Sequence, residues 1–328
     1  MAKNGEIQNI AIVGTGVIGA SWAALYLARG FKVVATDPGP NAEANLRKYI
    51  DDAWKELEVI GLSPNASRDN LEFTLDMKKA LANADLVQEN GPERKDFKIK
   101  LFADMDAATP PDAIIASSSS GLTMSVMQSA CKHPERCVIG HPFNPPHVIP
   151  LVEVVAGEKT SSETVERALS FYKSIGKKPI HVRKEVVGHV ANRLQAALYR
   201  EVVYLIEQGV LDVADSDVAV CWGPGLRWGV MGPNLLFHLG GGQDGIKHFM
   251  AHLGPALATW WKDLGTITEF SPQVTKTIID GVQQEAAGRS IDELAEERDK
   301  VLLGLLALRN ETSSEAKSEP KQEEVFSH

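Results

Sequence analysis

The sequence has few cysteines and no long hydrophobic run. Its three cysteines are Cys131, Cys137 and Cys221, and no two of them form a CxxC pair. An odd number of cysteines without such a pair is typical of free thiols in a reducing compartment, and we expect no metal site. No apolar run approaches the length that spans a bilayer, and residues 1–7 lack a hydrophobic signal segment. We therefore expect a cytoplasmic protein without membrane contact.

A surplus of positive charge is also missing. Lys and Arg number 34 against 43 Asp and Glu, which gives a net charge of −9 at pH 7. Because no dense basic block occurs, this balance argues against a surface for nucleic acid or anionic membrane. Apolar residues make up 44% of the 328 residues, enough for real cores in one large or two medium domains.

Patterns of strand and helix alternate from the start of the chain to Val187. Short buried strands are expected at residues 9–13, 33–37, 86–88, 113–116, 138–139, 152–155 and 179–182. Helical patterns separate several of them, at residues 20–27, 95–105 and 162–175. This alternation predicts an α/β Rossmann domain with a doubly wound, largely parallel sheet over residues 1–187. Residues 41–80, with Trp54, Leu57 and Ile60 at helical spacing, predict a helical arm or pair of helices.

The pattern changes after Val187, where no further strand is indicated. Amphipathic helices are expected at residues 188–209, 214–221, 234–239, 245–253, 272–286 and 290–308. Residues 188–309 therefore form a predicted all-helical domain. The tail, residues 310–328, is polar in its first part and is expected to be disordered.

The first expected strand runs into a glycine-rich turn, Gly14-x-Gly16-x-x-Gly19, that encloses Val17 and Ile18. Gly14 permits the tight turn, Gly16 lets the backbone approach a pyrophosphate, and Gly19 allows close packing of helix on strand. The amino terminus of the following helix offers free N–H groups to the phosphates. The alternative, a glycine-rich turn that binds nothing, does not explain the acid described next.

Asp37 ends the second expected strand, eighteen residues beyond Gly19. A carboxylate there accepts hydrogen bonds from the adenosine ribose and repels a 2′-phosphate, and no Arg lies beside it. FAD uses the same turn, but usually at the start of a much larger chain. The sequence therefore predicts NAD as the cofactor.

A second motif places His141 at the end of one strand and Glu153 inside the next apolar strand. A carboxylate in an apolar run is costly unless it is paired, and an ion pair with His141 would satisfy it. Such a pair fixes the imidazole tautomer and makes the ring a general base for a hydroxyl proton. The alternative is that His141 bonds to the backbone while Glu153 faces water.

Two polar side chains complete the predicted site. Ser120 ends a run of four serines behind a strand, at the edge where open α/β sheets bind ligands. Asn192 lies near the start of the first helix of the helical domain. Both side chains can donate hydrogen bonds to a reacting oxygen. Taken singly, they also fit an ordinary turn and a polar first helical turn.

These motifs stand in the order and at the separations of the 3-hydroxyacyl-CoA dehydrogenase superfamily, which the chain resembles from Ile10 to about Leu308. The resemblance implies a Rossmann domain followed by a helical domain that forms a homodimer. It implies the following catalytic set: His141 as base, Glu153 as its partner, and Ser120 and Asn192 as contacts of the substrate oxygen. It also implies that Glu93 and Lys98 contact the cofactor.

Within this superfamily, residues 222–242, 248–255 and 288–291 most resemble the L-carnitine dehydrogenase branch, which is related to L-gulonate 3-dehydrogenase and lambda-crystallin. The resemblance implies oxidation of a small 3-hydroxy acid, L-carnitine to 3-dehydrocarnitine. Aromatic rings suit the quaternary ammonium of such a substrate. The candidate rings of the helical domain are Trp222, Trp228, Phe237, Trp260 and Trp261. Packing in a core is the alternative for each ring.

Three other functions stay open. The adjacent pair Trp260-Trp261 departs from the branch pattern, so L-gulonate or another 3-hydroxy acid is an alternative substrate. A 3-hydroxyacyl-CoA is a second alternative, but it would need cationic residues in the arm to meet the CoA phosphates. The cations there are offset by acids: Arg47, Lys48, Lys55 and Arg68 by Asp51, Asp52, Glu56 and Glu58. A non-catalytic, crystallin-like protein is the alternative from another class, and the intact catalytic set argues against it.

Overall fold

The computed structural model describes residues 7–318, and the side chains of residues 7–311. The chain divides into two compact units, one up to Arg193 and one from Leu194 onward. The boundary was expected after Val187. It falls later because the backbone N–H groups of Val190 and Ala191 bind a strand residue of the first unit.

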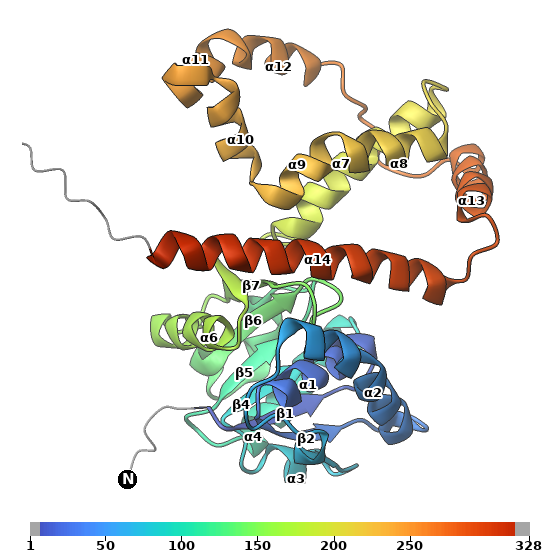
Figure 1. The fold of residues 1–328 in the computed structure, drawn as a ribbon. Coiled ribbons are helices and arrows are strands. Elements are labelled where there is room, and N and C mark those ends of the chain that lie inside the picture. The colour runs from blue at the N-terminus through green and yellow to red at the C-terminus, as the bar shows by residue number, and fades with distance from the viewer. Residues whose placement is uncertain (1–6, 319–328) are drawn as a thin grey trace, which may run out of the picture. The chain divides into compact units, whose positions relative to one another are not determined.

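An eight-stranded sheet forms the centre of the first unit (Figure 1), in the order β3-β2-β1-β4-β5-β6-β7-β8. The strands are β1 (Asn9–Val13), β2 (Lys32–Thr36), β3 (Leu71–Phe73), β4 (Leu86–Glu89), β5 (Ile114–Ser117), β6 (Cys137–Pro142), β7 (Leu151–Ala156) and β8 (Lys178–Val182). All neighbours pair in parallel except β6 and β7, which are antiparallel. The predicted Rossmann fold with a largely parallel sheet is confirmed.

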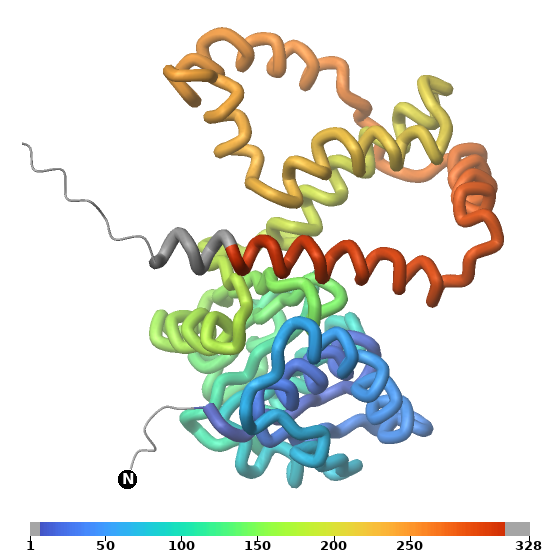
Figure 2. Tube along the Cα trace, in the orientation of Figure 1, coloured from blue at the N-terminus to red at the C-terminus, as the bar shows by residue number. Residues whose placement is uncertain are grey.

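Helices cover both faces of this sheet, and the trace in Figure 2 alternates between strand and helix from blue to green. They are α1 (Val17–Ala28), α2 (Ala42–Ile60), α3 (Met77–Leu81), α4 (Lys95–Ala108), α5 (Met124–Met127) and α6 (Ser162–Ser174). One core contains side chains of α1, α2 and α6, and the other contains side chains of α3, α4 and α5. Two-sided burial explains why the strands are apolar without alternation.

Residues 41–80, expected as a helical arm or a pair of helices, are helical in α2 and again from Met77 in α3. Leu46, Ile50 and Leu57 of α2 are buried, because this helix packs against α1. Beyond Gly61 the chain forms a short 3-10 turn, then β3 and α3. The strand β3 was not expected, because three residues are too few to show a period.

The second unit is helical, as predicted. Together with α7 (Ala191–Glu207), which begins just before the boundary, its helices are α8 (Val213–Trp222), α9 (Pro224–Val230), α10 (Pro233–Gly240), α11 (Gly245–His252), α12 (Gly254–Trp260), α13 (Pro272–Ala286) and α14 (Ile291–Ser318). A small core joins α7, α8 and α13 through Val203, Ile206, Val213 and Val274. Among residues 7–318, no helix is both long and apolar enough to cross a membrane.

Two helix ends differ from the prediction. The helix expected from Gly188 begins only at Ala191, because Gly188 and His189 have positive φ angles of 75° and 48°. The tail expected to be disordered from Asn310 is helical as far as Ser318. No Gly or Pro interrupts residues 310–318, and extending a formed helix is far easier than nucleating one. Residues 319–328 lie outside the described part of the chain.

Candidate active site

The centre of the site is a hydrogen-bonded pair on the antiparallel strands β6 and β7. His141 and Glu153 stand opposite each other in the register, and Nδ1 of His141 lies 2.8 Å from Oε2 of Glu153. Their exposed fractions are 6% and 0%. The expected pairing is therefore present, and it exists because the chain between the two strands returns directly instead of crossing over.

The second oxygen of Glu153 is also satisfied. Oε1 accepts hydrogen bonds from the backbone N–H groups of Val190 at 2.8 Å and Ala191 at 2.9 Å. Burial alone would raise the pKa of Glu153, but the bonds from His141, Ala191 and Val190 outweigh it and lower the pKa. The ionised carboxylate can only accept, so Nδ1 of His141 carries the proton. The lone pair on Nε2 is left to take a proton from a substrate.

The glycine turn has the shape that a pyrophosphate requires. Gly14 has a φ of +89°, and a Cβ at Gly19 would lie 1.9 Å from the Gly14 carbonyl oxygen. A Cβ at Gly16 would meet nothing within 4 Å, so the space above the turn is open. Helix α1 begins at Val17 and no side chain caps its first N–H groups. These groups therefore fit the phosphates of a dinucleotide.

Asp37 follows the end of β2, beside the glycine turn. Its Oδ2 accepts from the Thr15 backbone at 2.7 Å and from the Thr15 hydroxyl at 3.2 Å. Its Oδ1 accepts from the Gly39 backbone at 2.7 Å. The carboxylate is thus fixed at the carboxyl edge of the sheet, the position in which a Rossmann fold reads the adenosine ribose.

Glu93 and Lys98 hold the serine loop, residues 117–122. Glu93 accepts hydrogen bonds from the Ser119 hydroxyl at 2.5 Å and the Gly121 backbone at 2.7 Å. Burial would raise the pKa of Glu93, but these bonds and the Lys98 charge lower it. The Lys98 ammonium is almost fully buried and lies 2.9 Å from each carboxylate oxygen of Glu89.

Sequence reasoning missed Glu89 and Ser117, which complete this network. The Ser117 hydroxyl donates to Oε2 of Glu89 at 2.6 Å, and both side chains are fully buried. The available signal was a carboxylate at the end of an apolar strand, the same signal that identified Glu153. Ser120 and Asn192 are half-buried, and neither side chain has a hydrogen-bond partner among the described residues.

The loop between β6 and β7 is held by the side chain of Lys177. This side chain is 4% exposed, and its ammonium donates to the carbonyls of Pro146 and, at 2.8 Å, Ile149. It also lies 5.2 Å from the centre of the Trp22 ring. Burial and the Arg29 guanidinium lower the pKa of Lys177 to about 7. The loop that follows His141 is therefore anchored by a buried amine.

The five candidate aromatics all lie in the second unit. The four tryptophans are exposed, from 42% for Trp228 to 75% for Trp222. Within the described residues, none of these four rings contacts another aromatic ring, whereas Phe237 stacks on Phe249 at 4.4 Å. The four tryptophan rings therefore do not pack in a core.

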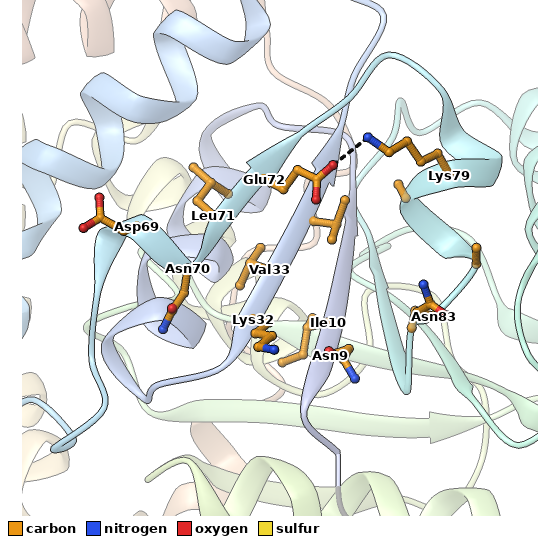
Figure 3. Close-up of a pocket in the computed structure, with 14 residues that line it drawn as sticks. Asn9, Ile10, Lys32, Val33, Asp69, Asn70, Leu71, Glu72, Lys79 and Asn83 are labelled. Carbon is orange, nitrogen blue, oxygen red and sulfur yellow. Dashed lines mark hydrogen bonds and ion pairs between the residues drawn. The ribbon is translucent and has the colours of Figure 1, made fainter.

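A separate pocket of about 480 Å³ lies at the amino ends of β1, β2 and β3 (Figure 3). An ion pair of 2.7 Å joins Glu72 and Lys79 at its wall. Gly14 and Asp37 follow the opposite, carboxyl ends of β1 and β2. None of the predicted site residues lines this pocket.

A Rossmann sheet with an open glycine turn, an acid after its second strand and a buried His–Glu pair defines a dinucleotide-dependent dehydrogenase. Residues 9–186 match the NAD-binding domain of 3-hydroxyacyl-CoA dehydrogenase, and residues 188–281 match its C-terminal domain. The chain belongs to the 3-hydroxyacyl-CoA dehydrogenase family and is an NAD-dependent oxidoreductase. The family and cofactor predicted from the motifs are confirmed.

Known relatives resemble the chain over nearly its full length. The L-carnitine dehydrogenase of Bacillus cereus is 45% identical over 308 residues, 94% of each chain. That of Pseudomonas putida is 46% identical over 301 residues, 92% of this chain and 94% of the relative. A solved 5-formyl-3-hydroxy-2-methylpyridine 4-carboxylic acid 5-dehydrogenase, an NAD+-dependent dismutase, is 34% identical with a TM-score of 0.78, covering 93% of this chain and 99% of that one.

Proposed function

We propose that this enzyme oxidises the 3-hydroxyl group of L-carnitine to give 3-dehydrocarnitine. Similarity to L-carnitine dehydrogenases along nearly the whole chain carries the choice of substrate. The buried His141–Glu153 pair supports the chemistry, because oxidation of a secondary alcohol needs a base for the hydroxyl proton. NAD+, when bound, supplies the acceptor for the hydride that leaves C3.

The protein residues act on the proton and the oxygen. Nε2 of His141 takes the hydroxyl proton as the C3–H bond breaks, and Glu153 stabilises the resulting imidazolium. Ser120 and Asn192 donate hydrogen bonds to the same oxygen, which their free side chains support. The cofactor set of the proposal comprises Gly14, Gly16, Val17, Ile18, Gly19, Asp37, Glu93 and Lys98. Because Lys98 is buried against Glu89, its part is to hold Glu93 and the serine loop.

The trimethylammonium group is assigned to aromatic rings of the second unit. A cation over an aromatic face is stabilised by about 0.5–2 kcal/mol without any hydrogen bond. The candidates are Trp222, Trp228, Phe237, Trp260 and Trp261. Exposed faces of the tryptophans support this, since rings committed to a core would not be available.

A CoA thioester is disfavoured by the charges of α2. Arg47 pairs with Glu43 at 2.8 Å and Lys48 with Asp52 at 2.5 Å. Arg68, which lies beyond the end of α2, pairs with Asp51 of α2 at 2.6 Å. A surface meant for CoA phosphates would leave such cations unbalanced.

We assign the enzyme to the cytoplasm, the reducing compartment that its free cysteines suit, and infer a homodimer. Large apolar residues are exposed on the second unit, including Leu239, Met250 and Leu253 at 63%, 64% and 48%. Burial of large exposed apolar side chains is what stabilises a permanent subunit interface. Sedimentation of the pure protein tests this inference, and a monomer at micromolar concentration would contradict it.

The substrate is tested by comparing four alcohols at matched concentration with NAD+: L-carnitine, 3-hydroxybutyrate, L-gulonate and 3-hydroxybutyryl-CoA. We expect L-carnitine to give the highest kcat/KM, read as NADH absorbance. If another compound is oxidised and L-carnitine is not, the assignment of L-carnitine as substrate is wrong, and the assignment as a dehydrogenase stands. If none of the four compounds is oxidised, the dehydrogenase activity is contradicted and the non-catalytic, crystallin-like alternative is favoured.

A further inference from the structure

His189 is a second histidine beside the proposed base, and no motif identifies it. Its ring lies 5.1 Å from the His141 ring, centre to centre, at an interplanar angle of 54°. The side chain is 2% exposed. Its φ angle of +48° is unusual for a residue other than glycine, so the surrounding contacts hold it there against a local preference.

The hydrogen bonds of His189 define its protonation. Nε2 lies 3.0 Å from the carbonyl oxygen of Ser119. A carbonyl only accepts, so Nε2 carries the proton. Nδ1 is buried and has no hydrogen-bond partner among the described residues. A charged ring would leave a buried N–H unpaired next to His141, which is costly, so the ring is neutral with a bare lone pair on Nδ1.

The contact with Ser119 matters because of the residue that follows. The Ser119 hydroxyl is held by Glu93, and its carbonyl is held by His189. Ser119 is therefore fixed at both its side chain and its backbone, and it is 2% exposed. The carbonyl belongs to the peptide bond that leads directly into Ser120, whose side chain is free.

The backbone of His189 belongs to the turn that supports the base. Its N–H donates to the Val186 carbonyl at 3.1 Å. The next two residues, Val190 and Ala191, donate their N–H groups to Glu153. One residue thus connects the serine loop, the His–Glu pair and the start of α7.

We propose that His189 is a positioning residue of the dehydrogenase. It holds the Ser119 carbonyl in place, and this places the Ser120 side chain at the same substrate oxygen that His141 deprotonates. This inference rests on the proposed function. The effect should appear in the chemical step, because a displacement of a donor by about 1 Å can cost up to roughly a hundred-fold in rate. NAD affinity should change little, because the Ser119 hydroxyl keeps its bond to Glu93 and His189 does not contact Gly14 or Asp37.

The test compares His189→Phe with His189→Gln. Phe keeps the ring and its packing but loses the donor, whereas the Gln amide can still donate near the position of Nε2. We expect kcat to fall roughly 10- to 100-fold in His189→Phe and to stay within about three-fold of the unmodified enzyme in His189→Gln. The Kd of NADH, measured by fluorescence, should stay within about two-fold in both. His181→Phe, at an exposed position of β8, is the matched control.

An equal fall of kcat in both variants, or a normal kcat in His189→Phe, would contradict the proposed role of His189. Parallel loss of NADH binding and thermal stability would show a merely structural role and also overturn it. Nitrogen NMR of the unmodified protein gives a second readout: we expect the neutral ring with its proton on Nε2, and a proton on Nδ1 contradicts the proposal. An unmodified protein without activity on any alcohol sinks the proposed function instead.

Discussion

Ser21 in α1 and His147 in the loop after β6 are joined by two hydrogen bonds. The Ser21 hydroxyl accepts from the His147 backbone at 2.9 Å and lies 2.7 Å from Nδ1 of its ring. The other ring nitrogen of His147 bonds to Glu56 of α2. The loop that follows His141 is thereby tied to α1 and α2, two of the helices that cover this side of the sheet.

Ser21→Ala should destabilise the protein by about 1–3 kcal/mol, because it leaves a buried N–H group and a ring nitrogen unpaired. Urea unfolding followed by circular dichroism measures the change. Ser174→Ala, at an exposed position of α6, is the matched control. An unfolding midpoint equal to that of the unmodified protein would show that the loop does not depend on this contact.

Replacement of the proposed base should slow the chemical step and leave the affinity for NADH nearly unchanged. His141→Ala should lower kcat by roughly two to four orders of magnitude, the usual effect of losing a general base. Glu153→Gln should also be severely impaired, because an amide cannot stabilise the imidazolium. Steady-state kinetics and NADH fluorescence check both, with His133→Ala at an exposed position as control. Near-normal turnover in His141→Ala would show that another group takes the proton.

Asp37 should determine the preference for NAD over NADP. The unmodified enzyme should bind NADH well and NADPH poorly, because the carboxylate opposes the extra phosphate. Asp37→Ala should weaken NADH binding, because the carboxylate that fixes the Thr15 and Gly39 backbone is lost. It should also reduce the difference in affinity between NADH and NADPH, because the negative charge that opposes the 2′-phosphate is gone. Fluorescence titration with both cofactors measures this. Equal affinity of the unmodified enzyme for both would refute the assignment.

Lys177 should make stability depend on pH in the alkaline range. Its folded pKa of about 7 lies below the ordinary value of 10.5. Between these values the unfolded chain binds a proton that the folded chain has lost, so this residue's contribution to stability rises with pH through the window. Compared with Lys177→Met, the unmodified protein should gain up to about 4 kcal/mol from pH ~7 to pH ~10.

Urea unfolding at several pH values measures that difference. Lys178→Met, the exposed neighbour, should follow the unmodified protein throughout. Parallel pH curves for the unmodified protein and Lys177→Met would show that the buried amine keeps its ordinary affinity for protons.

The parts of the site that were predictable depend on local sequence. The glycine turn and Asp37 have fixed spacing, and the His141–Glu153 pair follows from two strands separated by a short loop. The contacts of His189 with Ser119 and of Lys177 with Pro146 join residues 70 and 31 positions apart. No periodicity or spacing encodes such contacts, so only the folded chain reveals them. The short strand β3 was missed because three residues define no period.

The buried amine of Lys177 also makes the loop behind His141 observable by chemical labelling. An amine with a pKa of about 7 is about half unprotonated at pH 7, and the unprotonated fraction is the nucleophile. In the closed loop it is sealed against the Pro146 and Ile149 carbonyls. The rate at which Lys177 is acylated, relative to exposed lysines, therefore reports how often this loop opens in the native enzyme.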